Sequence, residues 1–177
     1  LQILVQEMGV AHGFPEGLAD EVMVFGSLHD IGKVAVPDSV LHKPGSFDAS
    51  EQALMRTHVN RGADLVERMV NDLHLHEVRG LDTLRASVSC HHEYLDGSGY
   101  PNGRYGDEIP LVARMVTIAD IFDAVTCDRP YKRGWTVADA YEYLSGMAAG
   151  DKLDRECVAA LRAARPKILE TMSRLQR

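Results

Sequence analysis

Apolar residues recur every three or four positions through most of this chain, which is the spacing of one face of an α-helix. No run of strictly alternating apolar and polar residues stands out, so the pattern predicts no strand. Glycine and proline interrupt the helical spacing and divide it into segments. The pattern therefore predicts an all-α fold.

The amino-terminal part is predicted to hold two helices followed by a loop. The first helix ends within residues 1–8, and the turn Gly13-Phe14-Pro15 separates it from a second helix over Glu16–Leu28. The segment Val34–Ser46 contains prolines and a glycine, so an ordered loop with no more than one turn of helix is expected.

A longer helix is predicted to begin at Asp48. Asp48 and Glu51 are three residues apart, as in a capping box, where two side chains satisfy the first backbone N–H groups of a helix. Apolar residues continue at helical spacing as far as Met69. This spacing places His58 on the inward, apolar face.

The next two predicted helices also contain polar residues, His91 and Asp120, at positions expected to face the core. Asp82 or Thr83 can cap a helix that reaches His91. Pro110 suits the first turn of the following helix, which is apolar around much of its circumference and contains Asp120. A carboxylate in a mostly buried helix is costly unless it is paired or bound to a metal.

The rest of the sequence predicts three short amphipathic helices, with Thr136 and Asp154 as caps and Pro166 as a break. A length of 177 residues fits one domain. The chain starts at Leu1 without a signal-peptide pattern, so we expect it to be a piece of a longer protein.

Composition and charge limit the cellular compartment and the kinds of ligand that this chain is expected to have. No apolar run approaches the ~20 residues that a membrane span requires. The three cysteines lack CxxC spacing and predict neither a zinc knuckle nor a disulfide framework, so a reducing cytoplasm is expected. A net charge of −7 argues against broad binding to nucleic acid or anionic membranes. Any phosphate-bearing ligand is expected to be small and held by local cations or metals.

Six potential metal ligands occur at or near the inner faces of predicted helices. A lone histidine more often hydrogen-bonds backbone or solvent, but two adjacent pairs in one small domain favour a multinuclear metal centre. Nitrogen and oxygen donors without thiolates suit Fe, Mn, Zn, Ni or Mg. The set is His29, Asp30, His58, His91, His92 and Asp120.

Six ligands exceed the need of one tetrahedral zinc ion and suit two ions bridged by a carboxylate and a water. Ions ~3.5–4 Å apart clamp a phosphoryl group, and the bridging water becomes a hydroxide nucleophile at about neutral pH. Lys33, one turn past His29, could reach a phosphate oxygen or that water; a solvated surface lysine is the alternative.

Two loops add candidate binding residues. The segment Arg129-Pro130-Tyr131-Lys132-Arg133 concentrates cations around an aromatic ring and indicates a small anionic aromatic ligand, with a solvated basic loop as the alternative. The turn from Gly97 to Gly103 lacks the GxGxxG spacing of a dinucleotide fingerprint. It is better interpreted as a tight loop that lets the backbone approach a ligand or partner.

Several stretches point together to one known family. They are HDIGK at 29–33, PDSVLHKPG at 37–45, His58, HHEYLDGSGYP at 91–101, IADIFDAV at 118–125 and DRPYK at 128–132. In this combination the chain resembles the HD-GYP domain, a branch of the HD superfamily of metal-dependent phosphohydrolases. The resemblance implies a single-domain helical bundle of the HD type with an added carboxy-terminal helical part. It also implies cytoplasmic hydrolysis of cyclic di-GMP to pGpG or GMP, with two or three divalent ions, commonly iron or manganese.

The resemblance implies roles for individual residues. The six ligands above would bind metal, with Asp30 as a bridge and Lys33 assisting at the scissile phosphate. Arg129 and Lys132 would hold the phosphates or guanine of the substrate, with Tyr100 as a further substrate contact. Gly99, Tyr100 and Pro101 form the signature loop of the family, which is associated with contacts to diguanylate cyclase (GGDEF-type) partners.

Family members have a further His, and some a Glu, on a helix ahead of the HD pair, and these positions would fall before Leu1. The resemblance thus implies a truncated amino-terminal helix and an upstream sensor or receiver domain outside this chain. One alternative is a non-catalytic cyclic di-GMP sensor or docking module that acts through the GYP loop. Another is an HD phosphohydrolase for a different nucleotide. Whether the chain forms a homodimer stays open.

Overall fold

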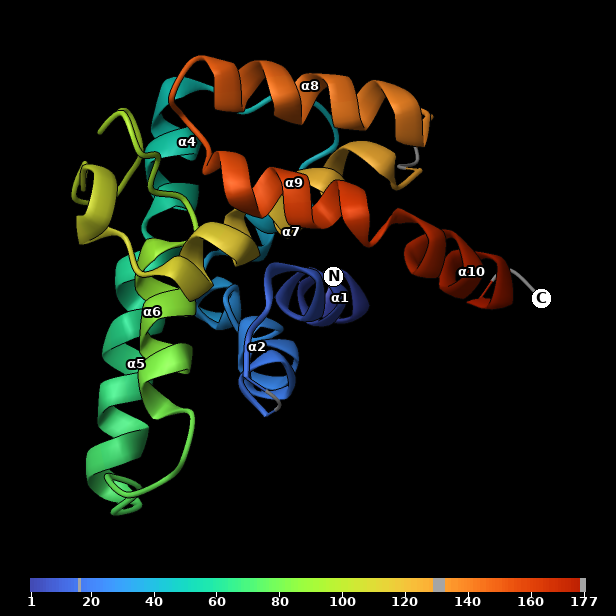
Figure 1. Cartoon of the computed structure of the whole chain (residues 1–177). Helices are drawn as coiled ribbons and strands as arrows, with labels where there is room; N and C mark the ends of the chain where they lie inside the picture. Colours follow the sequence, from blue (N-terminus) through green and yellow to red (C-terminus); the bar gives the residue numbers. More distant parts are fainter. Residues whose placement is uncertain (16, 129–132, 176–177) are drawn as a thin grey trace.

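The fold is a set of helices packed around one long helix, α7 (Leu111–Thr126), as the computed structural model in Figure 1 shows. The structure describes residues 1–15, 17–128 and 133–175. Within these ranges there is no strand, and one isolated bridge joins Asp96 to Tyr105. The predicted all-α class is confirmed. The other elements are α1 (Gln2–His12), α2 (Leu18–Gly26), the 3-10 helix η1 (Ile31–Ala35), α3 (Asp38–Leu41), α4 (Ala49–Arg56), α5 (His58–Asp72), α6 (Leu81–Cys90), the 3-10 helix η2 (Gly106–Glu108), α8 (Val137–Ala149), α9 (Arg155–Ala163) and α10 (Arg165–Leu175).

The α7 helix forms the centre of the core because it is apolar around most of its circumference, as its sequence predicts. Helices α1, α2, α6, α8 and α9 all pack against it. Asp120 lies on this helix, and its side chain is 29% exposed. The fully buried residues of α7 include Met115, Val116, Ile118, Ala119 and Phe122.

The α5 and α6 helices lie side by side and extend away from the rest of the molecule (Figure 1), and η1 packs against the start of α5. Gly32 in η1 permits this contact, because a Cβ at that position would lie 1.9 Å from the carbonyl oxygen of His58. The turn before η1, which contains His29 and Asp30, is thereby held beside His58.

The structure corrects the long helix that the sequence predicts from Asp48. The capping box is confirmed, but the helix is interrupted at Thr57, between α4 and α5. Thr57 Oγ1 donates a hydrogen bond to the Leu54 carbonyl (2.7 Å), and His58 Nδ1 donates one to the Met55 carbonyl (2.7 Å). Side chains that bond to nearby carbonyls in this way compete with regular helix. His58 therefore stands at the start of a helix, and it is buried.

The start of α6 also differs from the prediction, since neither Asp82 nor Thr83 caps it. The N-cap is Gly80, whose φ of 84° lies in the left-handed region. A Cβ on Gly80 would lie 2.1 Å from the ring of Phe25. Close packing against α2, rather than a polar cap, therefore sets where α6 begins.

The carboxy-terminal helices follow the prediction. Thr136 and Asp154 cap α8 and α9 by accepting backbone N–H groups, and Pro166 lies in the first turn of α10, after the end of α9. Figure 1 shows α8 and α9 together on one side of the molecule, with α10 leading away from α9. In the part of the chain that the structure describes, no helix is both long enough and apolar enough to cross a membrane.

Candidate metal centre

The six predicted metal ligands come from separate parts of the fold. The pair His29-Asp30 lies in the turn between α2 and η1, and His58 is the first residue of α5. The pair His91-His92 follows α6, and Asp120 lies within α7. The packing of η1 against α5, and of α6 against α7, brings these segments together.

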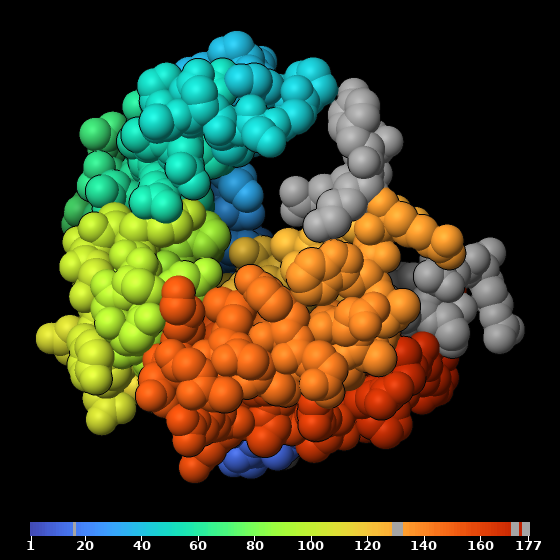
Figure 2. All heavy atoms as spheres, turned by 90° about the horizontal axis from the view of Figure 1, so that it is seen from above, coloured from blue at the N-terminus to red at the C-terminus, as the bar shows by residue number. Residues whose placement is uncertain are grey.

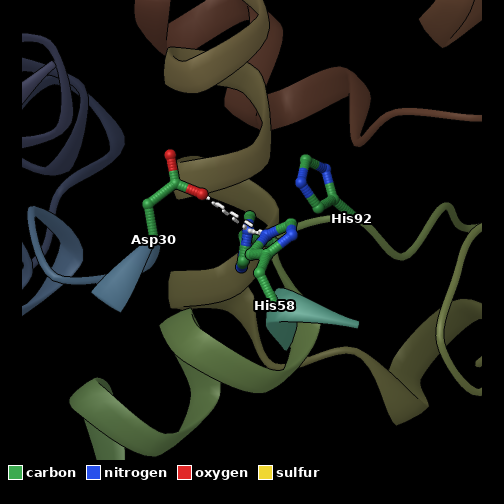
Figure 3. Close-up of side chains that lie close together, drawn as sticks. Asp30, His58 and His92 are labelled. Carbon is green, nitrogen blue, oxygen red and sulfur yellow. Dashed lines mark hydrogen bonds and ion pairs between the residues drawn. The ribbon is translucent and has the colours of Figure 1, made fainter. Parts of the chain in front are cut away.

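Four of these residues form one compact cluster. One ligand atom from each of Asp30, His58, His91 and His92 lies within 4.8 Å of the others. Oδ1 of Asp30 lies 3.3 Å from Nε2 of His58 and 3.8 Å from Nε2 of His91. Figure 3 shows the carboxylate of Asp30 directed across the cluster toward His58, with His92 entering from another segment.

The same carboxylate connects the cluster to His29 and Asp120. Oδ2 of Asp30 lies 3.3 Å from Nε2 of His29, and that nitrogen lies 3.6 Å from Oδ1 of Asp120. The two oxygens of Asp30 thus face two different groups of donors. This is the arrangement expected of a carboxylate that bridges two cations.

Three of the histidines are fixed by a hydrogen bond from the far side of the ring. In each, Nδ1 contacts a backbone carbonyl three or four residues earlier in the chain. A carbonyl only accepts, so Nδ1 carries a proton, and Nε2, which offers a lone pair when the ring is neutral, faces the other candidate ligands. The three bonds run from His29 to Gly26 (2.8 Å), from His58 to Met55 (2.7 Å) and from His91 to Ser87 (2.8 Å).

The six candidate ligands include polar atoms that a cation would satisfy. Nε2 of His29 and Oδ1 of Asp30 are buried and have no hydrogen-bond partner within the described residues. Nε2 of His58 and Nε2 of His91 lie 3.2 Å apart, and the bonds at Nδ1 leave both with lone pairs that face each other. Buried lone pairs without donors are costly. The residues present therefore fit a divalent metal ion.

Burial keeps the cluster histidines neutral. It lowers the pKa of His91 to about 3, with a further contribution from the neighbouring His92. It lowers the pKa of His92 to about 3 as well, and that of His58 in the same direction. Neutral imidazole is the form that binds metal, so these three side chains are ready for ligation at physiological pH.

His29 and Asp30 shift in opposite directions. Burial alone would lower the pKa of His29, but the carboxylates of Asp120 and Asp30 raise it to about 9. Burial alone would raise the pKa of Asp30, but His29 and Lys33 hold it well below its usual range. In the metal-free protein, Asp30 is therefore ionised, and the His29 ring is a cation, protonated on both nitrogens, at neutral pH.

Two of the predicted substrate-side residues lie next to the cluster. Nζ of Lys33 lies 2.5 Å from Oδ2 of Asp30. The ring of Tyr100 stacks on that of His92, with centroids 4.7 Å apart. Arg129 and Lys132 lie outside the described residues, so their predicted role stays a prediction.

Sequence reasoning gave no role to Glu93, although it directly follows the histidine pair. Glu93 is 2% exposed, and its two oxygens accept the backbone N–H groups of Asn102 (2.8 Å) and Arg104 (3.0 Å). It therefore anchors the glycine-rich loop instead of joining the metal donors. Its position in the sequence is equally consistent with a ligand, and only the direction of the side chain separates the two roles.

Sequence comparison agrees with this geometry. A profile of the HD domain matches residues 1–157. The chain belongs to the HD-domain family. Its resemblance to HD-GYP-type phosphohydrolases is confirmed by the relatives that match it.

Three curated relatives illustrate the match. The chain is 44% identical over 125 residues to the 3'3'-cGAMP-specific phosphodiesterase 2 of Vibrio cholerae, covering 71% of this chain and 23% of that protein. It is 42% identical over 156 residues to a cyclic di-GMP phosphodiesterase response regulator of Xanthomonas campestris, covering 86% and 39%. It is 45% identical over 127 residues to a cyclic di-GMP phosphodiesterase of Pseudomonas aeruginosa, covering 71% and 28%. The chain thus spans less than half of the length of these relatives.

Proposed function

We propose that this chain is the catalytic domain of a metal-dependent phosphodiesterase that hydrolyses cyclic dinucleotides, with cyclic di-GMP as the first candidate and pGpG or GMP as the product. The observation that carries the proposal is the carboxylate of Asp30, which lies between two groups of nitrogen and oxygen donors. The names of the relatives support the same class of reaction, since they are phosphodiesterases of cyclic di-GMP or 3'3'-cGAMP.

The donor set fits two divalent ions, for which iron and manganese are the first candidates. Oδ1 of Asp30, together with the three neutral histidines of the cluster, would hold one ion. Oδ2 of Asp30, together with His29 and Asp120, would hold the other. Ions bound in such a pair supply Lewis acidity and a water that ionises near neutral pH.

Lys33 is proposed to hold the phosphate group that is cleaved. Its side chain is 38% exposed while Nζ contacts Oδ2 of Asp30. An ammonium group has three donors, so one can remain on Asp30 while another reaches a phosphate oxygen. In that position Lys33 would offset the negative charge that develops on the phosphate during hydrolysis.

The open surface of the protein is compatible with a small substrate, and its overall charge disfavours a long polyanionic one. Figure 2 shows an open hollow between the teal segment of α3 and α4 and the orange segment of α8, with blue and gold atoms of the segments near η1 and within α7 on its floor. The net charge of −7 disfavours a long polyanion. The proposal retains Arg129 and Lys132 as the predicted cations for the second phosphate or a guanine.

The test uses purified protein that contains all 177 residues, loaded anaerobically with Fe²⁺ or aerobically with Mn²⁺. Hydrolysis of cyclic di-GMP is followed by separation of pGpG and GMP. We expect turnover by the wild type and a loss of at least about 100-fold in His91→Ala. His74→Ala is the matched control, because this histidine is exposed, and it should retain full activity. Metal-loaded protein that hydrolyses no cyclic dinucleotide would refute the proposal.

The same assay separates the candidate substrates. A metal centre recognises phosphate and is indifferent to the base, so cyclic di-GMP and 3'3'-cGAMP are compared side by side. Binding of cyclic di-GMP without hydrolysis, unaffected by His91→Ala and His92→Ala, would favour a sensor instead. Contact of Gly99, Tyr100 and Pro101 with a diguanylate cyclase stays a prediction, as does a cytoplasmic location.

A further inference from the structure

His92 is held differently from the other histidines of the metal centre. His29, His58 and His91 each donate Nδ1–H to a backbone carbonyl. The ring of His92 has no hydrogen-bond partner within the part of the chain that is described. A ligating imidazole whose orientation is not fixed binds metal less tightly. The plane of the His92 ring must therefore be set by another kind of contact.

Tyr100 makes that contact. Its ring stacks on the His92 ring, with centroids 4.7 Å apart and planes inclined by 24°. The backbone N–H of Tyr100 also donates a hydrogen bond to the carbonyl of His92 (3.0 Å). Both the main chain and the ring of Tyr100 are thus tied to His92, and stacking of two planar rings restricts rotation of either one.

Arg56 makes a second contact with the Tyr100 ring. Its guanidinium carbon lies 4.7 Å from the ring centroid, within the range of a cation–π contact. Arg56 is the last residue of α4 and stands two positions before His58. No carboxylate pairs with Arg56 among the described residues. The ring of Tyr100 is therefore contacted both by Arg56 and by His92.

The loop backbone is shaped to bring Tyr100 to this place. A Cβ on Gly99 would lie 2.4 Å from the backbone nitrogen of Tyr94 and 2.6 Å from the carbonyl oxygen of His92. Only glycine permits so close an approach. Further along, the buried carboxylate of Glu93 holds the backbone of Asn102 and Arg104. The loop is thus fixed on both sides of Tyr100.

We propose that Tyr100 is the positioning residue of His92, and that the cation–π contact of Arg56 helps to hold the Tyr100 ring in place. The stack replaces the backbone hydrogen bond that fixes the other three histidines. This inference rests on the proposed metal centre and deepens it. It gives the Gly99–Pro101 loop a role inside the centre, separate from any contact with a protein partner.

The test is a titration of metal-free protein with Co²⁺, followed by visible absorption, in an Asp120→Asn background that weakens the other half of the centre. Tyr100→Leu removes the aromatic face, and we expect it to lower Co²⁺ affinity about 10–100-fold and to change the absorption spectrum. Tyr100→Phe keeps the ring and should bind within about twofold of the parent. Arg56→Ala should weaken binding about 2–5-fold.

Two matched controls test whether the effects are specific. Tyr105→Leu removes a tyrosine of the same loop that is 67% exposed, and Arg68→Ala removes an exposed arginine from α5. Both should bind Co²⁺ as the parent does. Circular dichroism and thermal unfolding of the metal-free variants confirm that each is folded. If Tyr100→Leu does not fold, the Co²⁺ affinity of Arg56→Ala is compared with that of Arg68→Ala, and equal affinities would overturn the inference.

Wild-type Co²⁺ affinity and spectrum in Tyr100→Leu would overturn the inference, and so would an equal loss in Tyr100→Phe. Failure of the inference is distinguishable from failure of the proposed function, because metal binding is measured without substrate. If the metal affinity depends on Tyr100 and Arg56 but the protein hydrolyses no cyclic dinucleotide, only the proposed function is refuted. Hydrolysis with a metal affinity that does not depend on Tyr100 or Arg56 refutes the stack alone.

Discussion

The backbone of Gly32 lies directly against the backbone of His58: a Cβ added to Gly32 would lie 1.9 Å from the His58 carbonyl oxygen. This contact sets the spacing between η1 and α5. Asp30 comes two residues before Gly32, and its Oδ1 lies 3.3 Å from Nε2 of His58. The distance between two metal donors therefore depends on a residue that has no side chain.

Gly32→Ala is accordingly expected to damage both stability and metal binding. The clash is with backbone atoms, which have no room to move, so a loss of about 3 kcal/mol or more in the free energy of unfolding is expected. Urea unfolding of the metal-free protein measures it. Gly146→Ala is the control, since its Cβ would meet nothing within 4 Å, and it should leave stability unchanged or raise it by up to about 1 kcal/mol. Equal midpoints for the two variants would contradict this role of Gly32.

Asp30 and Asp120 should differ in how many ions they control. Asp30 faces both groups of donors, whereas the ion pair of Asp120 within the described residues is with His29. Asp30→Asn should therefore reduce bound metal from about two ions per chain to fewer than one, and Asp120→Asn should leave about one. Elemental analysis after dialysis gives the count, and Asp64→Asn, an exposed position on α5, serves as the control. Equal metal content in Asp30→Asn and Asp120→Asn would argue against a shared carboxylate.

Metal binding should release a proton from His29. The pKa of His29 is raised to about 9 by Asp120 and Asp30 despite its burial, while the pKa values of His91 and His92 are about 3. Between about pH 5 and pH 9, His29 is thus the ligand that must lose a proton, and affinity for the ion it binds should rise about tenfold per pH unit and level off above pH 9. Calorimetry in buffers of different ionisation enthalpy measures the released proton. In His29→Ala the metal affinity should no longer rise with pH. If it still rises, the released proton comes from another group.

Glu93 should matter for the loop and not for the count of metal ions. Its carboxylate accepts two backbone N–H groups from a buried position, so Glu93→Ala should cost about 1–3 kcal/mol in the free energy of unfolding. Bound metal should still approach the wild-type count when the ion is in excess. Glu77→Gln, on the surface, provides the baseline for removing one acidic charge. Loss of a whole ion from Glu93→Ala at saturating metal would instead identify Glu93 as a ligand.

The sequence predicts most of the helices because their signals are local, and it brings the candidate metal donors into view for the same reason. The apolar spacing around Asp120 and the caps at Thr136 and Asp154 are contained in short segments, and the structure confirms them. The donors are recognisable because His29-Asp30 and His91-His92 are adjacent in the chain. Their types alone indicate nitrogen and oxygen ligation.

What the sequence does not predict depends on contacts between distant segments. The packing of Gly32 against His58 and of Gly80 against Phe25 follows from where helices meet, which no local pattern encodes. The stack of Arg56 on Tyr100 likewise joins α4 to a loop far along the chain. A single sequence gives no signal for such pairs.

The central claim is that Asp30 bridges two metal ions, and anomalous scattering from crystals grown with Mn²⁺ or Fe²⁺ tests it most directly. The account predicts two anomalous peaks about 3.5–4 Å apart, one beside each carboxylate oxygen of Asp30, with His58 and His91 against the first and His29 and Asp120 against the second. A single peak, or peaks that do not contact Asp30, would contradict it.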